Sequence, residues 1–229
     1  MSHPIVRAIG LVIVLASLVG CGAEDPADES GGSLGQPITC NGAGARFATG
    51  TIAHSFGPGQ SVGQNLFPKP ILGPPKGAGC CEGSLDVVSL GNGGSVTVEF
   101  AHNAIVDGPG PDFIVFENAF YVNGDESVVF AELATVAVSE DGSSWTEFPC
   151  TATEAPYGSC AGQAPVYAGP DAPEIDPLDP TAAGGDAFDL ADVGVERARY
   201  VRITDREDQV GQNGVFDLDA VGIVNPLCP

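Results

Sequence analysis

Apolar side chains recur at every second residue along much of this chain, and no segment keeps a helical period over more than two turns. Residues 95–100, SVTVEF, place Val96, Val98 and Phe100 on one face and polar residues on the other. This alternation is typical of a half-buried β-strand. Residues 112–116, DFIVF, are apolar on both faces, which indicates a central strand. The pattern therefore directs the chain into sheets.

Turn-forming residues separate these strands, because 32 glycines and 19 prolines occur among the 229 residues. The pair Asp141-Gly142 is a hairpin signal between two such segments. We expect further strands over residues 133–139, 145–148, 199–204 and 215–224. Many short strands joined by turns predict an all-β fold, an antiparallel β sandwich or jelly roll. The length suits one domain of this kind.

The chain carries 30 acidic and 8 basic side chains, a formal net charge of −22. A surface this acidic repels phosphate backbones and anionic lipid headgroups, which argues against nucleic-acid binding and polybasic docking to membranes. Hydrophobic residues make up 43% of the chain, enough to bury a core. We therefore expect a folded domain with no nucleic-acid partner.

The first 21 residues indicate export and a lipid anchor. Arg7 precedes an apolar run from Ala8 to Val19, which is typical of a signal peptide and shorter than a membrane-spanning helix of about 20 residues. The run ends in LVGC, residues 18–21, which resembles a bacterial lipobox and implies that Cys21 carries the lipid. An ordinary signal peptide with an incidental cysteine is the alternative. The lipid on Cys21 would then attach the protein to a bacterial membrane, at the outer membrane or cell surface.

Residues 21–36 are rich in Gly, Ser, Pro and acids and hold few apolar side chains. Such a segment gains too little from burial to fold, so we expect a flexible tether. Residues 1–20 are then a lipoprotein signal peptide, residues 21–36 an acidic tether and residues 37–229 a single β-sandwich domain.

Without Cys21, six of the seven cysteines remain, and an even number in an exported chain indicates three disulfides. Cys150 and Cys160 flank a short excursion and form the most economical local bridge. Cys80 and Cys81 are adjacent, so a bond between them strains the peptide, and we expect each to reach a distant partner. The sequence leaves open the order in which Cys40, Cys80, Cys81 and Cys228 pair.

Residues 151–185 depart from the strand pattern, because they contain six prolines, many acids and few strand-forming residues. We expect a long Pro-rich surface excursion, which is either a functional loop or variable decoration. Tyr157 and Tyr167 lie in it, where an aromatic ring can stack on the face of a sugar. These two tyrosines are the candidate ligand-binding residues.

Three strings in the second half of the chain resemble a known family: VSEDGSSWTEF (138–148), ARYVRITD (198–205) and FDLDAVGIV (216–224). They are similar to the discoidin-like, galactose-binding-like β sandwich. A longer series of motifs over residues 85–225 resembles exported bacterial cell-surface lipoproteins of no established activity. The resemblance implies a galactose-binding-like fold. Discoidin-like relatives commonly bind glycans or lipid headgroups and often hold a structural calcium ion.

Asp217 and Asp219 lie two residues apart in the last expected strand, so alternation places both carboxylates on the face of Val221 and Ile223. Carboxylates on a core face need a compensating group, and a hard cation such as calcium is one. The candidate metal ligands are Asp112, Glu117, Asn118, Asp186, Asp217 and Asp219. Alternatively, these acids cap turns, accept backbone N–H groups or pair with Arg199 and Arg202.

The chain contains no GxSxG, HExxH or P-loop string, so we predict no catalytic residues and no enzyme. A hydrolase that uses an acidic pair is an alternative, because glycoside hydrolysis needs two carboxyl groups about 5–10 Å apart. We expect His54 and His102 at strand edges or in turns, and Trp145 packed beside its turn. The expected core aromatics are Phe47, Phe100, Phe113, Phe116, Phe130 and Phe216.

These features together predict a non-catalytic, lipid-anchored cell-surface protein with a disulfide-bonded β sandwich. We expect it to bind an extracellular ligand such as a glycan and to hold a structural calcium ion. The alternative from another class is a structural or assembly protein of the cell envelope, which contacts an envelope protein and has no small-molecule site.

Overall fold

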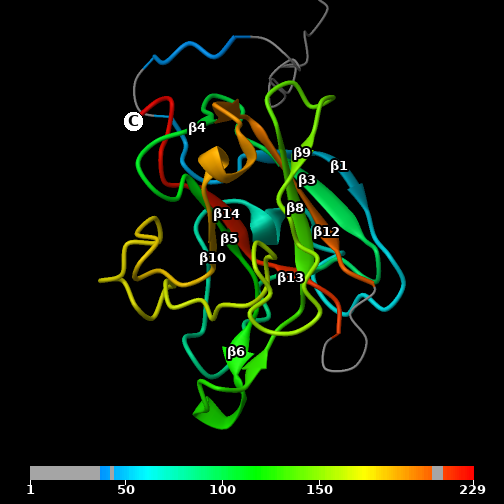
Figure 1. Cartoon of the computed structure of the whole chain (residues 1–229). Coiled ribbons are helices and arrows are strands. Elements are labelled where there is room, and N and C mark those ends of the chain that lie inside the picture. Colours follow the sequence, from blue (N-terminus) through cyan, green and yellow to red (C-terminus); the bar gives the residue numbers. More distant parts are fainter. Residues whose placement is uncertain (1–36, 42–43, 208–213) are drawn as a thin grey trace, which may run out of the picture.

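The computed structural model describes residues 37–41, 44–207 and 214–229. Antiparallel sheets make up almost all of its regular structure, which confirms the all-β fold class (Figure 1). The helical elements in these ranges are short 3-10 turns, η1 (Lys69–Ile71), η2 (Val122–Gly124) and η3 (Leu190–Val193). Among the residues described, no helix has the length and apolar character needed to span a membrane.

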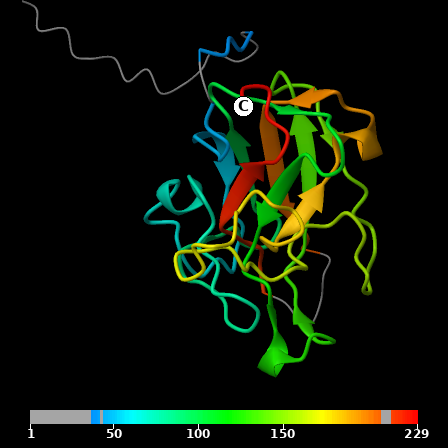
Figure 2. The ribbon, with the colours of Figure 1, turned by 90° about the vertical axis from the view of Figure 1, so that its left-hand side faces the viewer.

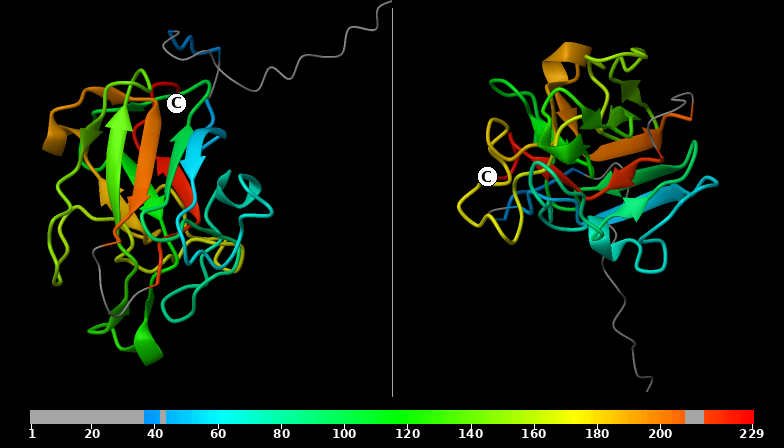
Figure 3. Two further views of the ribbon diagram at one scale, coloured as in Figure 1. Left: turned by 90° about the vertical axis from the view of Figure 1, so that its right-hand side faces the viewer. Right: turned by 90° about the horizontal axis from the view of Figure 1, so that it is seen from below.

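The larger sheet has five strands in the order β1-β3-β12-β8-β9, and its broad face is turned to the viewer in the left view of Figure 3. Its strands are β1 (Gly50–Ser55), β3 (Ser95–Glu99), β12 (Tyr200–Asp205), β8 (Ala134–Ser139) and β9 (Thr146–Glu147). The smaller sheet has the order β10-β5-β14 and faces the viewer in Figure 2. Its strands are β10 (Asp186–Phe188), β5 (Phe113–Phe116) and β14 (Ala220–Ile223). Every pairing in both sheets is antiparallel.

Three short antiparallel ribbons of two strands each accompany these sheets. The ribbons are β2 (Val88–Ser89) with β13 (Asp217–Leu218), β4 (Ile105–Val106) with β11 (Arg197–Ala198), and β6 (Phe120–Tyr121) with β7 (Val129–Phe130). The β6–β7 ribbon projects at one end of the molecule, and the C-terminus lies at the other (Figure 1).

The inner faces of the two sheets meet in one apolar core, so the architecture is that of a sandwich. The core joins residues of the larger sheet with residues of the smaller one: Val96, Val98, Val136, Val138, Val201 and Ile203 with Phe113, Val115, Phe188, Val221 and Ile223. Of the expected core aromatics, four are fully buried: Phe100, Phe113, Phe116 and Phe216. Phe47 and Phe130 are half-buried.

Two of the expected strands have the predicted form. Residues 113–116 form β5, the fully buried central strand of the smaller sheet. β8 and β9 form the hairpin expected around Asp141-Gly142. The expectation that residues 95–100 are half-buried is wrong, because Thr97 and Glu99 on the second face are each only 4% exposed. β3 pairs with a neighbour on both sides, and its second face is covered as well.

The expectation of one continuous strand over residues 215–224 is also wrong. The chain changes sheets near Asp219, so β13 pairs with β2 while β14 pairs with β5. The N–H of Asp219 donates to the carbonyl of Phe116 at this point. Because the strand is interrupted, the alternation that placed Asp217 and Asp219 on one face does not hold.

The Pro-rich segment 151–185 does more than form a surface loop. Three of its side chains, Val166, Ala168 and Ala183, pack against Ile114 and Phe116 on the outer face of the smaller sheet. The three are at most 3% exposed. Val166, Ala168 and Ala183 therefore cover a sheet face that the sandwich core leaves open, and for these three the prediction of a surface excursion is wrong. Residues 169–182 between them are half-buried or exposed, as a surface excursion would be.

The disulfides are Cys40–Cys228, Cys80–Cys81 and Cys150–Cys160. The expectation that Cys80 and Cys81 reach distant partners is wrong, since they are bonded to each other. Cys40 and Cys228 lie next to the N-terminal segment and the C-terminus, and their bond ties the two ends of the domain together. The carbonyl of Cys80 accepts the N–H of Tyr121 at 2.7 Å, which holds the vicinal pair against β6.

Candidate functional site

Five polar residues from separate parts of the chain meet at one end of the smaller sheet. Glu117 and Asn118 follow β5, and Glu132 follows β7. Asp217 begins β13 and lies opposite Ser89 of β2 in the ladder. The N–H of Asp217 donates to Oε1 of Glu117 at 3.3 Å. We call Ser89, Glu117, Asn118, Glu132 and Asp217 the acidic cluster.

The carboxyl groups of the acidic cluster are buried. Glu117 is 1% exposed, Glu132 8% and Asp217 9%. Oε2 of Glu117, Oδ1 of Asp217 and Oγ of Ser89 have no hydrogen-bond partner within the described part of the chain. Leaving a buried polar atom without a partner costs about 1–3 kcal/mol, and more for a charged group. The cluster therefore has three atoms that a ligand of the right chemistry would satisfy.

Burial and mutual repulsion make the charged forms of the carboxyl groups in the acidic cluster unfavourable. Burial raises the pKa of Glu117 well above its ordinary value, and the charge of Glu132 raises it further. Burial and the charge of Asp217 raise the pKa of Glu132 to about 7. Burial also raises the pKa of Asp217. The ion pairs Lys76–Asp86 and Arg197–Glu140 lie elsewhere and compensate none of these charges.

Backbone groups from two loops close around the acidic cluster. The N–H of Ser84 donates to Oδ1 of Asn118, and the N–H of Gly214 donates to Oε1 of Glu132 at 2.8 Å. Gly83 lies so close that a Cβ there would be 2.7 Å from Oδ1 of Asn118. The available donor atoms are carboxylate, amide and hydroxyl oxygens, a set that suits calcium or magnesium and not zinc.

The fold gathers only three of the six metal-ligand candidates, Glu117, Asn118 and Asp217. Asp219 lies apart, with both of its oxygens accepting the N–H of Lys76. Asp186 accepts the N–H groups of Gly162 and Gln163 through Oδ2. Burial raises the pKa of both Asp186 and Asp219 to about 7. These two acids thus hold loops in place, as the alternative interpretation of the acids expected.

Asp112 lies at the opposite end of β5, in a second acidic group. One oxygen each from Asp107, Asp112 and Asp189 lie within 4.8 Å of one another. Asp112, however, already accepts the N–H groups of Gly108 and Leu190 and the amide of Asn225. Asp189 accepts the N–H of Ala191 at the start of η3. Asp112 and Asp189 are thus explained by the turns that they cap.

Glu132 completes the acidic cluster and was not among the candidates from the sequence. It stands in Phe130-Ala-Glu-Leu133, an acid within an otherwise apolar run. A lone acid in such a run is a signal of burial, and buried acids need a partner. The partner itself is invisible in the sequence, because Glu132 approaches Glu117 and Asp217 only in the folded chain.

The two candidate ligand-binding tyrosines, Tyr157 and Tyr167, lie beside different groups in the described part of the chain. Tyr157 packs against the Cys150–Cys160 bridge and its neighbours. Tyr167 lies beside Tyr121, and burial together with that phenol raises the pKa of Tyr167 to about 12.

Arg202, which the sequence offered as a partner for the acids, stacks its guanidinium over Trp145 instead, with Cζ 4.4 Å from the ring centre.

No protein-family model matches this chain, and no curated protein matches it either. The signal peptide, the lipidated Cys21 and the tether predicted from the sequence lie outside the described residues.

Proposed function

We propose that this protein is an exported, lipid-anchored domain of the cell surface that binds an extracellular glycan without catalysis, and that a calcium ion held by the acidic cluster completes its galactose-binding-like sandwich. The single observation that carries the cation is the set of buried oxygen atoms without partners on Glu117, Asp217 and Ser89. A divalent cation bound there would offset the mutual repulsion of the three carboxylates and satisfy those orphaned oxygens that it reaches.

The chemistry of the acidic cluster favours calcium over other cations. Calcium takes 6–8 oxygen ligands in variable geometry, which three carboxylates with Asn118, Ser89 and backbone carbonyls can supply. Magnesium demands a near-ideal octahedron and retains several waters, which a cluster this buried has little room to hold. A cation here would join β5, β7 and β13, so its role is structural.

Thermal unfolding of the purified, oxidised protein tests the cation. Calcium at one hundred times Kd adds about 2.7 kcal/mol to the free energy of unfolding, a rise of about 2–4 °C in Tm for each kcal/mol. Glu117→Gln removes one orphaned oxygen and one charge, and should abolish the calcium-dependent rise. Glu126→Gln, at an exposed acid, is the matched control and should keep it. Equal Tm values in calcium and in chelator would reject the cation site.

Metabolic labelling with a radioactive fatty acid tests the anchor separately. We expect label in the wild-type protein and none in Cys21→Ser, because the thiol of Cys21 is the acylated atom in a bacterial lipoprotein. Label that persists in Cys21→Ser would reject the lipidation site. The support for export is the sequence of residues 7–21, together with three disulfides in the folded domain.

A further inference from the structure

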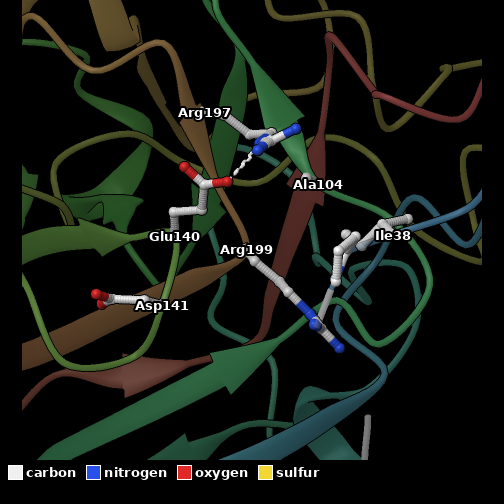
Figure 4. Close-up of a pocket in the computed structure, with 7 residues that line it drawn as sticks. Ile38, Ala104, Glu140, Asp141, Arg197 and Arg199 are labelled. Atoms are coloured by element: carbon white, nitrogen blue, oxygen red, sulfur yellow. Dashed lines mark hydrogen bonds and ion pairs between the residues drawn. The ribbon is translucent and has the colours of Figure 1, made fainter. Parts of the chain in front are cut away.

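A cavity of about 250 Å³ lies beside residues 37 and 38, and none of its lining residues belongs to the acidic cluster. It is lined by Pro37, Ile38, Ala104, Glu140, Asp141, Arg197 and Arg199 (Figure 4). The β4–β11 ribbon, the β8–β9 turn and the N-terminal segment each contribute residues to it. The volume falls just below the range of about 300–1,000 Å³ typical of drug-sized ligands, so the cavity suits a smaller molecule.

The ion pair between Arg197 and Glu140 is the centre of this region. Nε and Nη2 of Arg197 both donate to Oε1 of Glu140. Two shallower depressions of about 430 and 270 Å³ also contain both residues in their lining. Three depressions therefore adjoin one exposed ion pair, an arrangement that suits a ligand built of successive small units.

The lining offers hydrogen-bond donors and acceptors in balance. Arg197 and Arg199 bring two positive charges, and Glu140 and Asp141 bring two negative charges. Nη2 of Arg199 donates to the carbonyl of Ala101 at 2.9 Å, which fixes the side chain beside the cavity. Oδ1 of Asp141 accepts the N–H groups of Ser143 and Ser144, which fixes its carboxylate. Pro37, Ile38 and Ala104 add an apolar surface.

A neutral ligand rich in hydroxyl groups matches this lining. A hydroxyl both donates and accepts, so neighbouring hydroxyls can bond to a guanidinium and a carboxylate at once. Anions are disfavoured, because the chain has a net charge of −22 and Glu196 adds another acid to the adjoining depressions. We infer that the Arg197–Glu140 depressions bind consecutive sugar units of a neutral oligosaccharide, an inference that rests on the proposed glycan-binding role and moves its site away from Tyr157 and Tyr167.

Titration calorimetry of the purified, oxidised protein tests the inference with D-galactose, N-acetyl-D-glucosamine and their β-linked disaccharides, and with D-galacturonate as the charged match. We expect millimolar binding of at least one neutral sugar, tighter binding of its disaccharide and weaker binding of galacturonate. Arg197→Ala and Glu140→Ala should each weaken neutral-sugar binding by about tenfold or more, because each removes charge-assisted hydrogen bonds.

Lys76→Ala is the matched control, because Lys76 and Asp86 form an ion pair of similar exposure outside these depressions. Sugar binding should be unchanged in this variant. Three results would overturn the inference: no sugar binding up to the solubility limit, an equal loss in Lys76→Ala, or tighter galacturonate binding in Glu140→Ala, which would reveal an anion site. The calcium-dependent Tm rise is measured on the same samples. A normal rise without sugar binding rejects this inference alone, whereas absence of both rejects the proposed function as well.

Discussion

Residues of the same type have different structural roles in this protein. Acids illustrate this best, because Asp112 caps turns, Asp219 holds a backbone N–H and Glu117 keeps a buried oxygen without a partner. All three side chains carry the same group in the sequence. Their different roles follow from the donors that the fold brings to each carboxylate.

Asp112→Ala should lower the free energy of unfolding by about 3 kcal/mol or more. Asp112 is fully buried, and its removal leaves the N–H groups of Gly108 and Leu190 and the amide of Asn225 without their acceptor. Chemical denaturation measures the loss. Asp107→Ala, an exposed member of the same acidic group, is the control and should change the free energy by less than about 0.5 kcal/mol. A similar loss in both variants would contradict the assignment.

Gly184→Ala should destabilise the protein more than Gly110→Ala, although both glycines have positive φ angles, +75° and +74°. A Cβ on Gly184 would lie 2.0 Å from the carbonyl oxygen of Pro165, whereas a Cβ on Gly110 has open space. Both variants lose about 1 kcal/mol or more to backbone strain, and Gly184→Ala loses roughly 1–3 kcal/mol beyond that. Equal midpoints in denaturant would show that the segment near Pro165 moves freely.

Among the secondary-structure elements, disulfides and one packed segment hold the short strands of the sandwich in place. Cys40–Cys228 joins residues 188 positions apart, Cys150–Cys160 closes a short loop and Cys80–Cys81 closes none. The segment around Val166 and Ala183 covers the outer face of β5. These long-range contacts hold together a fold whose individual strands are only two to six residues long.

The three disulfides should contribute very unequally to stability. The entropy that a cross-link removes from the unfolded chain increases with the logarithm of loop length. Loss of Cys40–Cys228 should therefore cost about 5 kcal/mol and loss of Cys150–Cys160 about 2–3 kcal/mol. Removal of Cys80–Cys81 by a double Cys→Ser change should cost less than either, because it encloses no loop. Denaturation of the three double variants gives the ranking. A large loss for Cys80–Cys81 would instead show that the bond holds the loop against Tyr121.

For the whole molecule, the balance of charge is the dominant constraint. The chain has a net charge of −22, and several of its acids are buried rather than solvated. Burial raises the pKa of Glu132, Asp186 and Asp219 to about 7. In the folded state these groups hold protons that the unfolded chain has already released near pH 5.

Without calcium, the protein should therefore lose stability as the pH rises from about 4 to above 7. A folded-state pKa above the unfolded value gives stability that is complete below the unfolded pKa and disappears through the folded one. For Glu132 alone, the rise from 4.5 to about 7 corresponds to about 3 kcal/mol. Thermal melts in chelator across this range measure the effect. A Tm that increases steadily with pH would contradict the burial of these carboxyl groups.

The fold class, the central strand β5, the β8–β9 hairpin and most of the aromatic core could be predicted from the sequence. These features depend on local alternation and turn residues, which any short window of the chain contains. Three members of the acidic cluster, Glu117, Asn118 and Asp217, were also among the metal ligands predicted from the sequence. The sequence could not separate them from Asp186 and Asp219, because a carboxylate's partners are set by distant backbone.

The folded structure was needed to show where the chain changes sheets at Asp219, what covers β5 and how the four cysteines other than Cys150 and Cys160 pair. It also placed Glu132 beside Glu117 and Asp217, and the Arg197–Glu140 pair between three depressions. These features join residues far apart in the chain, as the pairing of Cys40 with Cys228 does. Periodicity fixes which way a side chain faces along one strand, but the partner across a sheet or loop is fixed by packing of the whole domain.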